Sequence, residues 1–242
     1  MTFTDWLDHF RSNETHLDHI DWRACDHVDE REKAIIRASI QQFQKGENSE
    51  GRQLMAFAKK DGAKDHQEAV RYFIREEQRH SMALGTFMER NGIPRIKEHW
   101  VDTVFRRLRK LTGLENSVRV LLTAEIIAMV YYVALRDATA SRTLKAICQQ
   151  ILEDEELHIN FQSFTLHRYY HHKSRIRRFL VRNGHRILMT GTFFVVWLHH
   201  RSVLKAGGYG FKRFYRELFR EFERSERMIR GLDRIEVKKA AA

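Results

Sequence analysis

The chain has 242 residues, with one proline, 12 glycines and two cysteines, and its formal net charge is +11. This length is sufficient to bury a full core in one domain, or in one domain with an appendage. The scarcity of proline favours an all-α fold. Cys25 and Cys148 form neither a C-x-x-C pair nor a zinc pattern, which excludes a rubredoxin-type iron site and fits a reduced cytoplasmic compartment.

Residues 1–27 are predicted to form an N-terminal extension. They are rich in Asp, His and Trp and show no sustained periodicity, although Trp6, Leu7 and Phe10 fall on one short helical face. We expect this segment to pack across a helical bundle. The acidic side chains among its first ten residues are not those of a signal peptide.

A first pair of long helices is predicted next. Apolar residues recur at helical spacing from residue 29 to Phe57 and pass through Glu47. Asp61-Gly62 breaks the chain, and Asp65 is expected to cap the second helix. That helix is predicted to stop at Asn91-Gly92, which Ile-Pro follows directly.

A short basic crossover helix at 100–110 should lead to a second helix pair, at 116–138 and 142–167. The first helix of this pair is apolar almost all round, which is typical of a buried helix. Glu125 lies in its middle, where an unpaired carboxylate would be costly. Together with the first pair, these helices predict a four-helix domain over residues 28–168.

Residues 169–242 are predicted to form a basic helical appendage. From His167 to Ala242 there are 19 Lys and Arg against 6 Asp and Glu, a net charge of +13, which leaves −2 for residues 1–166. The uncharged run 187–198 is shorter than the ~20 residues that a membrane-spanning helix needs. We favour a helix that covers the open side of the bundle over a segment in a membrane interface. An amphipathic helix is expected at 211–229.

Two copies of a Glu-x-x-His motif, at 77–80 and 155–158, lie within the predicted bundle. A lone glutamate precedes each copy at the same distance, Glu47 before the first and Glu125 before the second. Corresponding residues of the two sets are therefore 78 positions apart. Because residues three apart share one face of a helix, the Glu and the His of each motif can reach a common point.

This residue set predicts a metal centre. Buried carboxylates are tolerated when they bind metal or are paired. Oxygen-rich donors combined with two imidazoles favour iron or manganese over magnesium or calcium. The predicted metal ligands are Glu47, Glu77, His80, Glu125, Glu155 and His158.

At residues 75–80 and 153–158 the chain resembles the ferritin-like superfamily of non-haem di-iron proteins, and the resemblance covers about residues 30–166. It implies a ferritin-like four-helix bundle that holds two iron ions, with manganese and iron as the alternative. It assigns Glu47, Glu77 and His80 to one iron and Glu125, Glu155 and His158 to the other, with one or two glutamates bridging. It also implies that Asp154, and as a weaker match Glu76, orients a metal-bound histidine.

Two positions depart from the pattern of this superfamily. Many of its oxygenases and desaturases carry a threonine one turn after the third-helix glutamate, where this chain has Ala128 and Met129. Ribonucleotide reductase small subunits carry a radical-forming tyrosine one turn after the first histidine, where this chain has Leu84. The second departure argues against a reductase subunit. Tyr131 and Tyr132 are expected to be core aromatics.

The resemblance implies a dioxygen-dependent oxidoreductase of the mono-oxygenase or desaturase type. Its expected substrate is apolar, such as a lipid or a carrier-bound acyl chain. No flavin or nicotinamide motif is present, so the electrons should come from a separate reductase. Three alternatives stay open: a ferroxidase or iron-handling protein, a di-iron hydroxylase of tRNA, and a purely structural set of carboxylate–arginine ion pairs.

The basic segment 169–242 predicts an anionic partner. Phospholipid headgroups, an acidic acyl-carrier protein and a nucleic acid all present such a surface. The expected location is the cytoplasm, or its membrane-facing periphery. A second copy of the chain is a further expected partner, as a homodimer.

Overall fold

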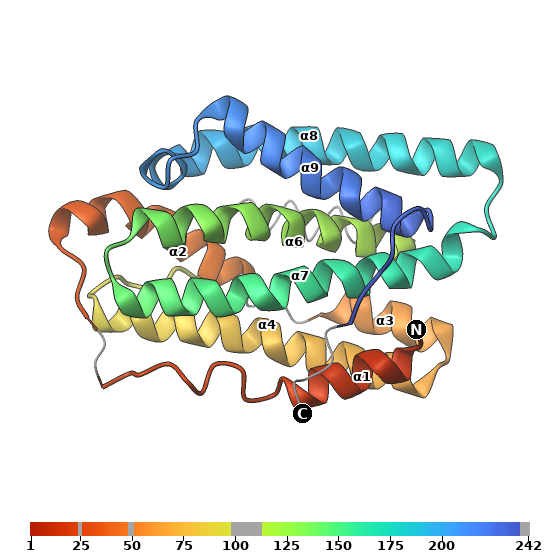
Figure 1. Cartoon of the computed structure of the whole chain (residues 1–242), viewed down its shortest axis with the longest axis horizontal. Helices are drawn as coiled ribbons and strands as arrows, with labels where there is room; N and C mark the ends of the chain where they lie inside the picture. The colour runs from red at the N-terminus through yellow and green to blue at the C-terminus, as the bar shows by residue number, and fades with distance from the viewer. Residues whose placement is uncertain (24–25, 48–50, 98–112, 238–242) are drawn as a thin grey trace.

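The computed structural model describes residues 1–23, 26–47, 51–97 and 113–237, and within these ranges it contains helices and no strand. The all-α class is thereby confirmed. The predicted crossover helix at 100–110 lies outside the described residues. The helices are α1 Phe3–Ser12, α2 Glu30–Glu47, α3 Arg52–Asp61, α4 Lys64–Arg90, α6 Gly113–Ala138, α7 Arg142–Tyr170, α8 Arg175–Ala206 and α9 Phe211–Ile229 (Figure 1).

The helices α2, α4, α6 and α7 run alongside one another and form the centre of the molecule (Figure 1). Two apolar clusters fill the space between them, and Phe43, Met129 and Val133 touch both clusters. As its composition predicts, α6 is buried on nearly every side. The apolar face of each helix therefore packs in this shared core. Polar side chains buried in the core need hydrogen-bond or ionic partners there.

The segment predicted as one helix to Phe57 is divided in two. Helix α2 ends at Glu47, and α3 begins only at Arg52. Gly51 adopts φ 57°, in the left-handed region that favours glycine, and a Cβ at this position would collide with Ile74. The chain therefore departs from helical geometry at Gly51, four residues after Glu47.

Asp65 was expected to cap α4, and this expectation is wrong. Ala63 holds the N-cap position and makes no side-chain capping bond. Instead, Asp65 Oδ2 accepts a hydrogen bond of 2.5 Å from the Thr4 hydroxyl of α1. A tertiary contact has taken the place of a local cap. The predicted stop is confirmed, because α4 ends at Arg90 and Gly92 adopts φ 66°.

The N-terminal segment packs across the bundle, as expected. Trp6, Leu7 and Phe10 of α1 are buried. The ring of Phe10 lies 6.1 Å from that of Phe73 on α4 and 5.2 Å from that of Phe161 on α7. These contacts fix the chain that follows α1 over the α4–α7 interface.

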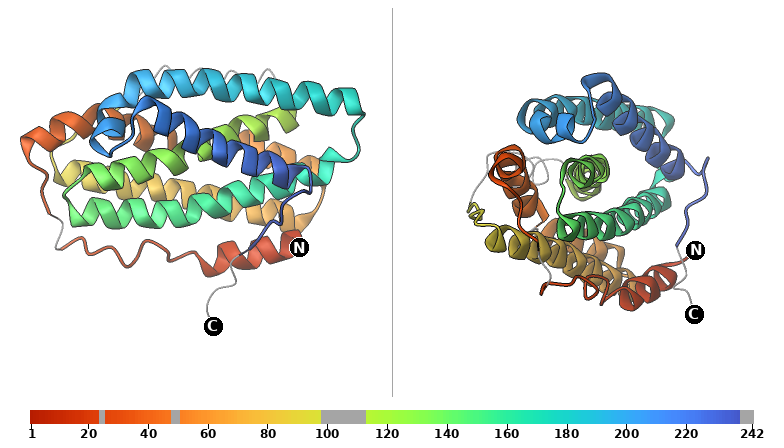
Figure 2. Two further views of the ribbon diagram at one scale, coloured as in Figure 1. Left: turned by 45° about the horizontal axis from the view of Figure 1, so that its top comes forward. Right: turned by 60° about the vertical axis from the view of Figure 1, so that its left-hand side comes forward.

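Helices α8 and α9 form an outer layer on the side of the bundle opposite α1 (Figure 2). The apolar run 187–198 is the middle of α8, and its Met189, Phe193 and Val196 are buried against the bundle. The favoured prediction, a helix that covers the open side, is thus confirmed for one face of α8. The expected helix at 211–229 matches α9.

Within the described residues, two helices are long and apolar enough to cross a membrane, judged by length and composition alone. In Glu115–Ala138 the most apolar window is 83% buried inside the protein, whereas in Arg175–Ala206 it is 39% buried. The first is therefore a core helix of the bundle. The second, α8, keeps much of its apolar surface exposed.

Candidate metal centre

All six predicted ligands converge on one buried place between α2, α4, α6 and α7. Their ligand atoms form two overlapping groups, and within each group these atoms lie within 4.8 Å of one another. The first group is Glu47, Glu77, His80 and Glu155, and the second is Glu77, Glu125, Glu155 and His158. Each of these four helices thus contributes one glutamate, and α4 and α7 each add a histidine.

The overlap between the groups distinguishes the glutamates. Glu77 and Glu155 belong to both groups, whereas Glu47 and Glu125 belong to one each. A carboxylate has two oxygens and can bind two cations at once. The arrangement therefore suits two cations side by side, with the glutamates of the two Glu-x-x-His motifs between them.

Several atoms in this cluster have no hydrogen bond of good geometry within the described part of the chain. They are Nδ1 of His80 and of His158, Oε1 of Glu77, and both carboxylate oxygens of Glu155. Buried polar atoms are normally satisfied, and each exception calls for a physical reason. Each of these atoms can offer a lone pair to a cation once it is deprotonated, and two of them, Nδ1 of His158 and Oε1 of Glu77, already lie 2.9 Å apart. A pair of cations would satisfy them together.

The two histidines are held by carboxylates from the opposite helix. His80 Nε2 on α4 lies 3.0 Å from Asp154 Oδ2 on α7. His158 Nε2 on α7 lies 3.0 Å from Glu76 Oε2 on α4. Asp154 and Glu76 are themselves 78 positions apart, so the repeat includes the histidine supports as well as the predicted ligands.

This crosswise pairing sets the orientation of each imidazole. A neutral imidazole carries one N–H and one lone pair. If Nε2–H donates to the carboxylate, the lone pair is left at Nδ1, which faces the glutamates. Such carboxylate–histidine pairs fix the tautomer and raise the basicity of a metal ligand.

Asn13, in the segment after α1, connects the two supporting carboxylates. Its Nδ2 donates to Glu76 Oε1 at 2.7 Å and to Asp154 Oδ1 at 2.9 Å. Gln150 Nε2 adds a bond of 3.1 Å to the same Asp154 oxygen. One side chain of the N-terminal segment therefore bridges both halves of the site.

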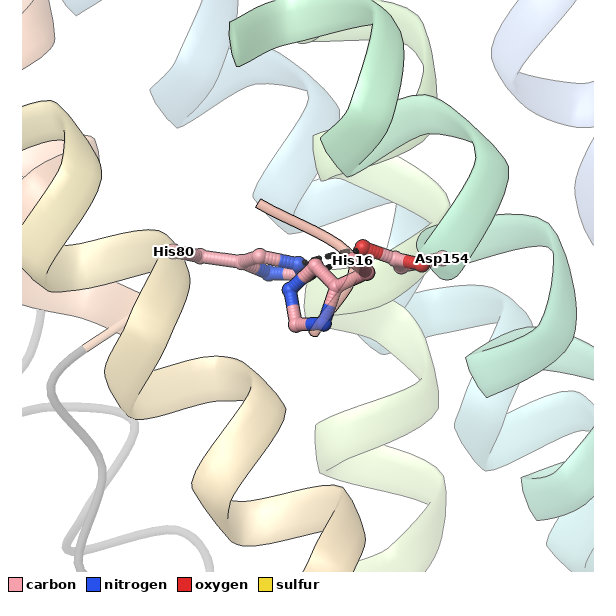
Figure 3. A group of neighbouring side chains, drawn as sticks. All are labelled: His16, His80 and Asp154. Atoms are coloured by element: carbon pink, nitrogen blue, oxygen red, sulfur yellow. Dashed lines mark hydrogen bonds and ion pairs between the residues drawn. The ribbon is translucent and has the colours of Figure 1, made fainter. Parts of the chain in front are cut away.

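His16 lies beside the same pair. Figure 3 shows His16 and His80 approaching Asp154, with His80 on α4 and Asp154 on α7. His16 Nε2 lies 3.5 Å from Asp154 Oδ2, and its Nδ1 is 2.7 Å from the carbonyl oxygen of Asn13. These three side chains also have cation-binding spacing. We interpret them as support for His80, because its other nitrogen already faces the glutamates.

Two further side chains hold the glutamates that belong to one group only. The Tyr132 hydroxyl donates to Glu47 Oε1 at 2.5 Å, and Gln162 Nε2 donates to Glu125 Oε1 at 2.6 Å. Burial, and then the charge of Glu47, raise the pKa of Tyr132 well above its usual value. Tyr132 therefore stays protonated and acts as a donor.

Burial governs the charge of the glutamates in the absence of a cation. It raises the pKa of Glu47 to about 8, with the neighbouring Glu77 adding to the effect. Burial also raises the pKa of Glu125, and burial together with the charge of Glu125 raises the pKa of Glu155. Without metal, protons must neutralise part of this cluster. Cation binding would therefore release protons.

The histidines respond in the opposite sense to burial. Burial alone would lower the pKa of His80, but the hydrogen bond and charge of Asp154 outweigh it and raise that pKa. Burial likewise opposes the charged form of His158, while the carboxylates of Glu155, Glu76 and Glu77 around it raise its pKa well above the usual value. Both imidazoles thus lie in a strongly negative environment that favours cations.

The sequence indicated most of this cluster but missed four supporting side chains, Asn13, His16, Gln150 and Gln162. Asn13 and His16 lie in a segment without periodicity, and nothing local shows that they reach residues 63 to 141 positions away. Gln162 had a usable signal. It lies one turn after His158 on a buried stretch, where a polar side chain needs a partner.

The fold and the site together define an all-α protein with a buried carboxylate–histidine cluster that could hold metal. Comparisons with models of known protein families, with curated proteins and with solved structures find no match to this chain. The functional argument therefore rests on the residues of the chain itself and on their geometry.

Proposed function

We propose that this chain is a ferritin-like di-iron protein that uses dioxygen to oxidise an apolar substrate. One observation carries the proposal. The predicted ligands and their two supporting carboxylates recur at one offset of 78 residues, and the two sets meet in one buried cluster. A four-helix bundle with two Glu-x-x-His helices and two further glutamates has the ligand set of the ferritin-like di-iron and di-manganese proteins.

The donor set favours iron among the common ions. Four carboxylates and two imidazoles suit a hard or borderline transition-metal ion, and no thiolate is present among the clustered residues. Magnesium and calcium prefer sites in which every ligand is an oxygen, so they would not account for the two histidines. A mixed manganese–iron pair uses the same donors and is the nearest alternative.

The chemistry follows from the surroundings of the cluster. Two irons bound there would supply the electrons that reduce dioxygen for substrate oxidation. The chain holds each imidazole through Asp154 or Glu76 and keeps the site dry. The ring of Phe73 lies 4.4 Å from that of His158, and Ile126 and Val130 of α6 are buried in the same apolar cluster as Phe73. An apolar substrate is compatible with these surroundings.

Reconstitution tests the proposal directly. The full chain is loaded anaerobically with Fe(II), its metal content is measured, and its optical spectrum is followed as oxygen is admitted. We expect two irons per chain and a transient absorption that decays faster when an accepted apolar substrate is present. Glu125→Ala should lower the iron content, whereas Glu153→Ala, an exposed neighbour of Asp154 on α7, should not.

Two results would contradict the proposal. Continued uptake and release of many irons per chain would favour a ferroxidase or an iron-handling protein. No bound metal, with stability unchanged by chelation, would leave the cluster as a structural set of buried polar groups.

A further inference from the structure

Helix α8 exposes a line of apolar side chains along its outer face, with Asn183-Gly184 and Thr190-Gly191 in the intervals between them. The side chains on this line are between 50% and 74% exposed, and they are Ile176, Leu180, Ile187, Phe194 and Leu198. They follow one another at intervals of four, seven, seven and four residues, so they share one face of a helix with 3.6 residues per turn. At 1.5 Å per residue the line is ~33 Å long.

The apolar line continues onto the next helix. Phe211 and Tyr215 of α9 are exposed. The ring of Phe211 lies 6.3 Å from that of Phe194 and 5.4 Å from that of Trp197. The exposed aromatic surface of α9 thus broadens the patch near the C-terminal half of α8. Isolated surface hydrophobics are ordinary, but a contiguous patch of this kind marks an interaction surface.

The charge of α8 has one sign only. The helix contains six arginines and one lysine and no Asp or Glu. Arg182 and Arg186 pair with Glu223 of α9. Arg175 and Arg177 lie at the N-terminal end of the apolar line, and no carboxylate among the described residues lies within ion-pair distance of either. The same holds at the other end for Arg201 and Lys205.

The opposite face of α8 is fixed to the protein by buried polar contacts. His185 Nδ1 lies 2.8 Å from Glu226 Oε1 on α9, and Arg119 of α6 donates to the same oxygen at 2.8 Å. His200 Nδ1 lies 2.8 Å from the Ser39 hydroxyl on α2. These buried contacts connect α8 to α9 and to α2, and separating them would leave buried polar groups without partners. Although its composition would allow it to cross a membrane, α8 is therefore held flat on the bundle.

The charge pattern decides between a second copy of the chain and a lipid surface. Two α8 helices facing each other would bring only cations together, in the parallel as well as the antiparallel orientation. A bilayer that contains anionic lipid offers hydrocarbon to the apolar line and phosphate to the arginines at its ends. Helices that lie in a membrane interface combine these two features.

We propose that the outer face of α8, together with Phe211 and Tyr215 of α9, docks the protein onto an anionic phospholipid surface. The helix lies parallel to the bilayer, with Ile187 and Phe194 inserted below the headgroups. This surface is on the side of the bundle opposite α1 (Figure 1). The proposal goes beyond the proposed oxidation chemistry and does not depend on it.

Vesicle binding tests this surface. The full chain is mixed with vesicles of phosphatidylcholine, alone or containing phosphatidylglycerol, and the bound fraction is measured by sedimentation. We expect binding to the anionic vesicles and its weakening by salt. The double variant I187E/F194E should bind about tenfold more weakly or worse, because two apolar side chains can no longer leave water. Arg175→Glu together with Arg177→Glu should weaken binding to the anionic vesicles only.

Met82→Glu is the matched control. Met82 is a 64% exposed apolar side chain on α4 and lies outside α8 and α9, so its replacement should leave lipid binding unchanged. All the substituted side chains are exposed, and thermal unfolding should confirm that each variant is folded. Equal binding to both vesicle types, or undiminished binding by I187E/F194E, overturns the proposal. So does a dimer in solution that dissociates in that double variant.

Discussion

The first half of the metal centre, on α2 and α4, and the second half, on α6 and α7, have the same ligands in different settings. Glu47 is the last residue of α2, whereas Glu125 lies in the middle of α6. Helix α4 begins without a side-chain cap, whereas Ser141 caps α7. The ligand positions repeat at 78 residues, but the structure that supports them does not.

This difference indicates that the two cation positions are not equivalent. A tyrosine hydroxyl holds Glu47, and a glutamine amide holds Glu125. The positions that correspond to Tyr132 and Gln162 in the first half are Leu54 and Leu84, neither of which can donate a hydrogen bond. Ligand geometry constrains both halves equally, since both must reach the same metals. The surrounding residues are constrained only to satisfy whatever is buried, and they can do so in different ways.

The largest effect should come from the residues that both halves share. Because Glu77 and Glu155 belong to both ligand groups, Glu77→Ala or Glu155→Ala should abolish binding at both positions. Glu47→Ala and Glu125→Ala should each remove one metal and retain the other. Elemental analysis of the reconstituted variants measures this directly. If Glu155→Ala retained one tightly bound metal, Glu155 would not be a bridge.

The crosswise carboxylates should have the next largest effect, and their effects should appear in the opposite half. Asp154→Asn should weaken the position that uses His80, and Glu76→Gln the position that uses His158. Losing such a support costs about 10- to 100-fold in metal affinity. Titration with Co(II), monitored through its absorption, would follow the two positions separately.

A double-mutant cycle sharpens this prediction. In the free energy of metal binding, Glu76→Gln combined with His158→Ala should show an interaction energy of about 0.5–3 kcal/mol, because the two residues form one hydrogen-bonded pair. Glu76→Gln combined with His80→Ala should be closer to additive. Coupling of equal size in the two cycles would contradict the crosswise assignment.

The parts of the fold that follow from helical periodicity were predictable from the sequence. The helix at 211–229, the stop at Asn91-Gly92 and the buried character of α6 all depend on local pattern, and all are confirmed. The helix break before α3 was missed, because the apolar spacing continues across it from Ile36 to Phe57. Asp65 was assigned wrongly, because its partner Thr4 is 61 residues away.

The candidate site shows the same division. The offset of 78 residues identified six candidate ligands, and the structure places all six together. That they bind metal stays a prediction. The same offset contained the crosswise pairs, since Glu76 and Asp154 obey it. The sequence did not show which histidine each carboxylate contacts. Asp154 is near His158 in the sequence, but it contacts His80 on the other helix.

Asn13 should have a smaller effect, unequal between the halves. In Asn13→Ala, Asp154 Oδ1 keeps the amide of Gln150, whereas Glu76 Oε1 loses its only donor among the described hydrogen bonds. The position that uses His158 should therefore weaken more, by about 1–3 kcal/mol for an unsatisfied buried group. The Co(II) titration measures both positions. Ser12→Ala, an exposed neighbour, is the control, and equal weakening of both positions would contradict the expected asymmetry.

The smallest expected effect concerns the start of α7. Asp26 Oδ1 accepts from the Ser141 hydroxyl at 2.6 Å, and Oδ2 accepts from the Arg142 N–H at 2.7 Å. Burial alone would raise the pKa of Asp26, but these hydrogen bonds hold it below its usual value of 3.8. The folded protein thus binds this proton more weakly than the unfolded chain does. The stabilisation is therefore present above pH 3.8 and is lost as the pH falls through the folded value.

Asp26→Asn should remove this contribution and lower the free energy of unfolding by about 0.5–1.5 kcal/mol, because both carboxylate oxygens accept hydrogen bonds and the amide replaces one of them with an NH2 donor. Urea unfolding at descending pH measures the difference, which should shrink as Asp26 is protonated in the wild type. Asp29→Asn is the control from the first half. Asp29 accepts from the Glu32 N–H at the start of α2, and asparagine serves there equally well. If both variants lost the same stability with the same pH dependence, the hydrogen bonds of Asp26 at the start of α7 would stabilise the protein no more than an ordinary helix cap does. The contrast between the two halves would then be confined to the side chains around the ligands.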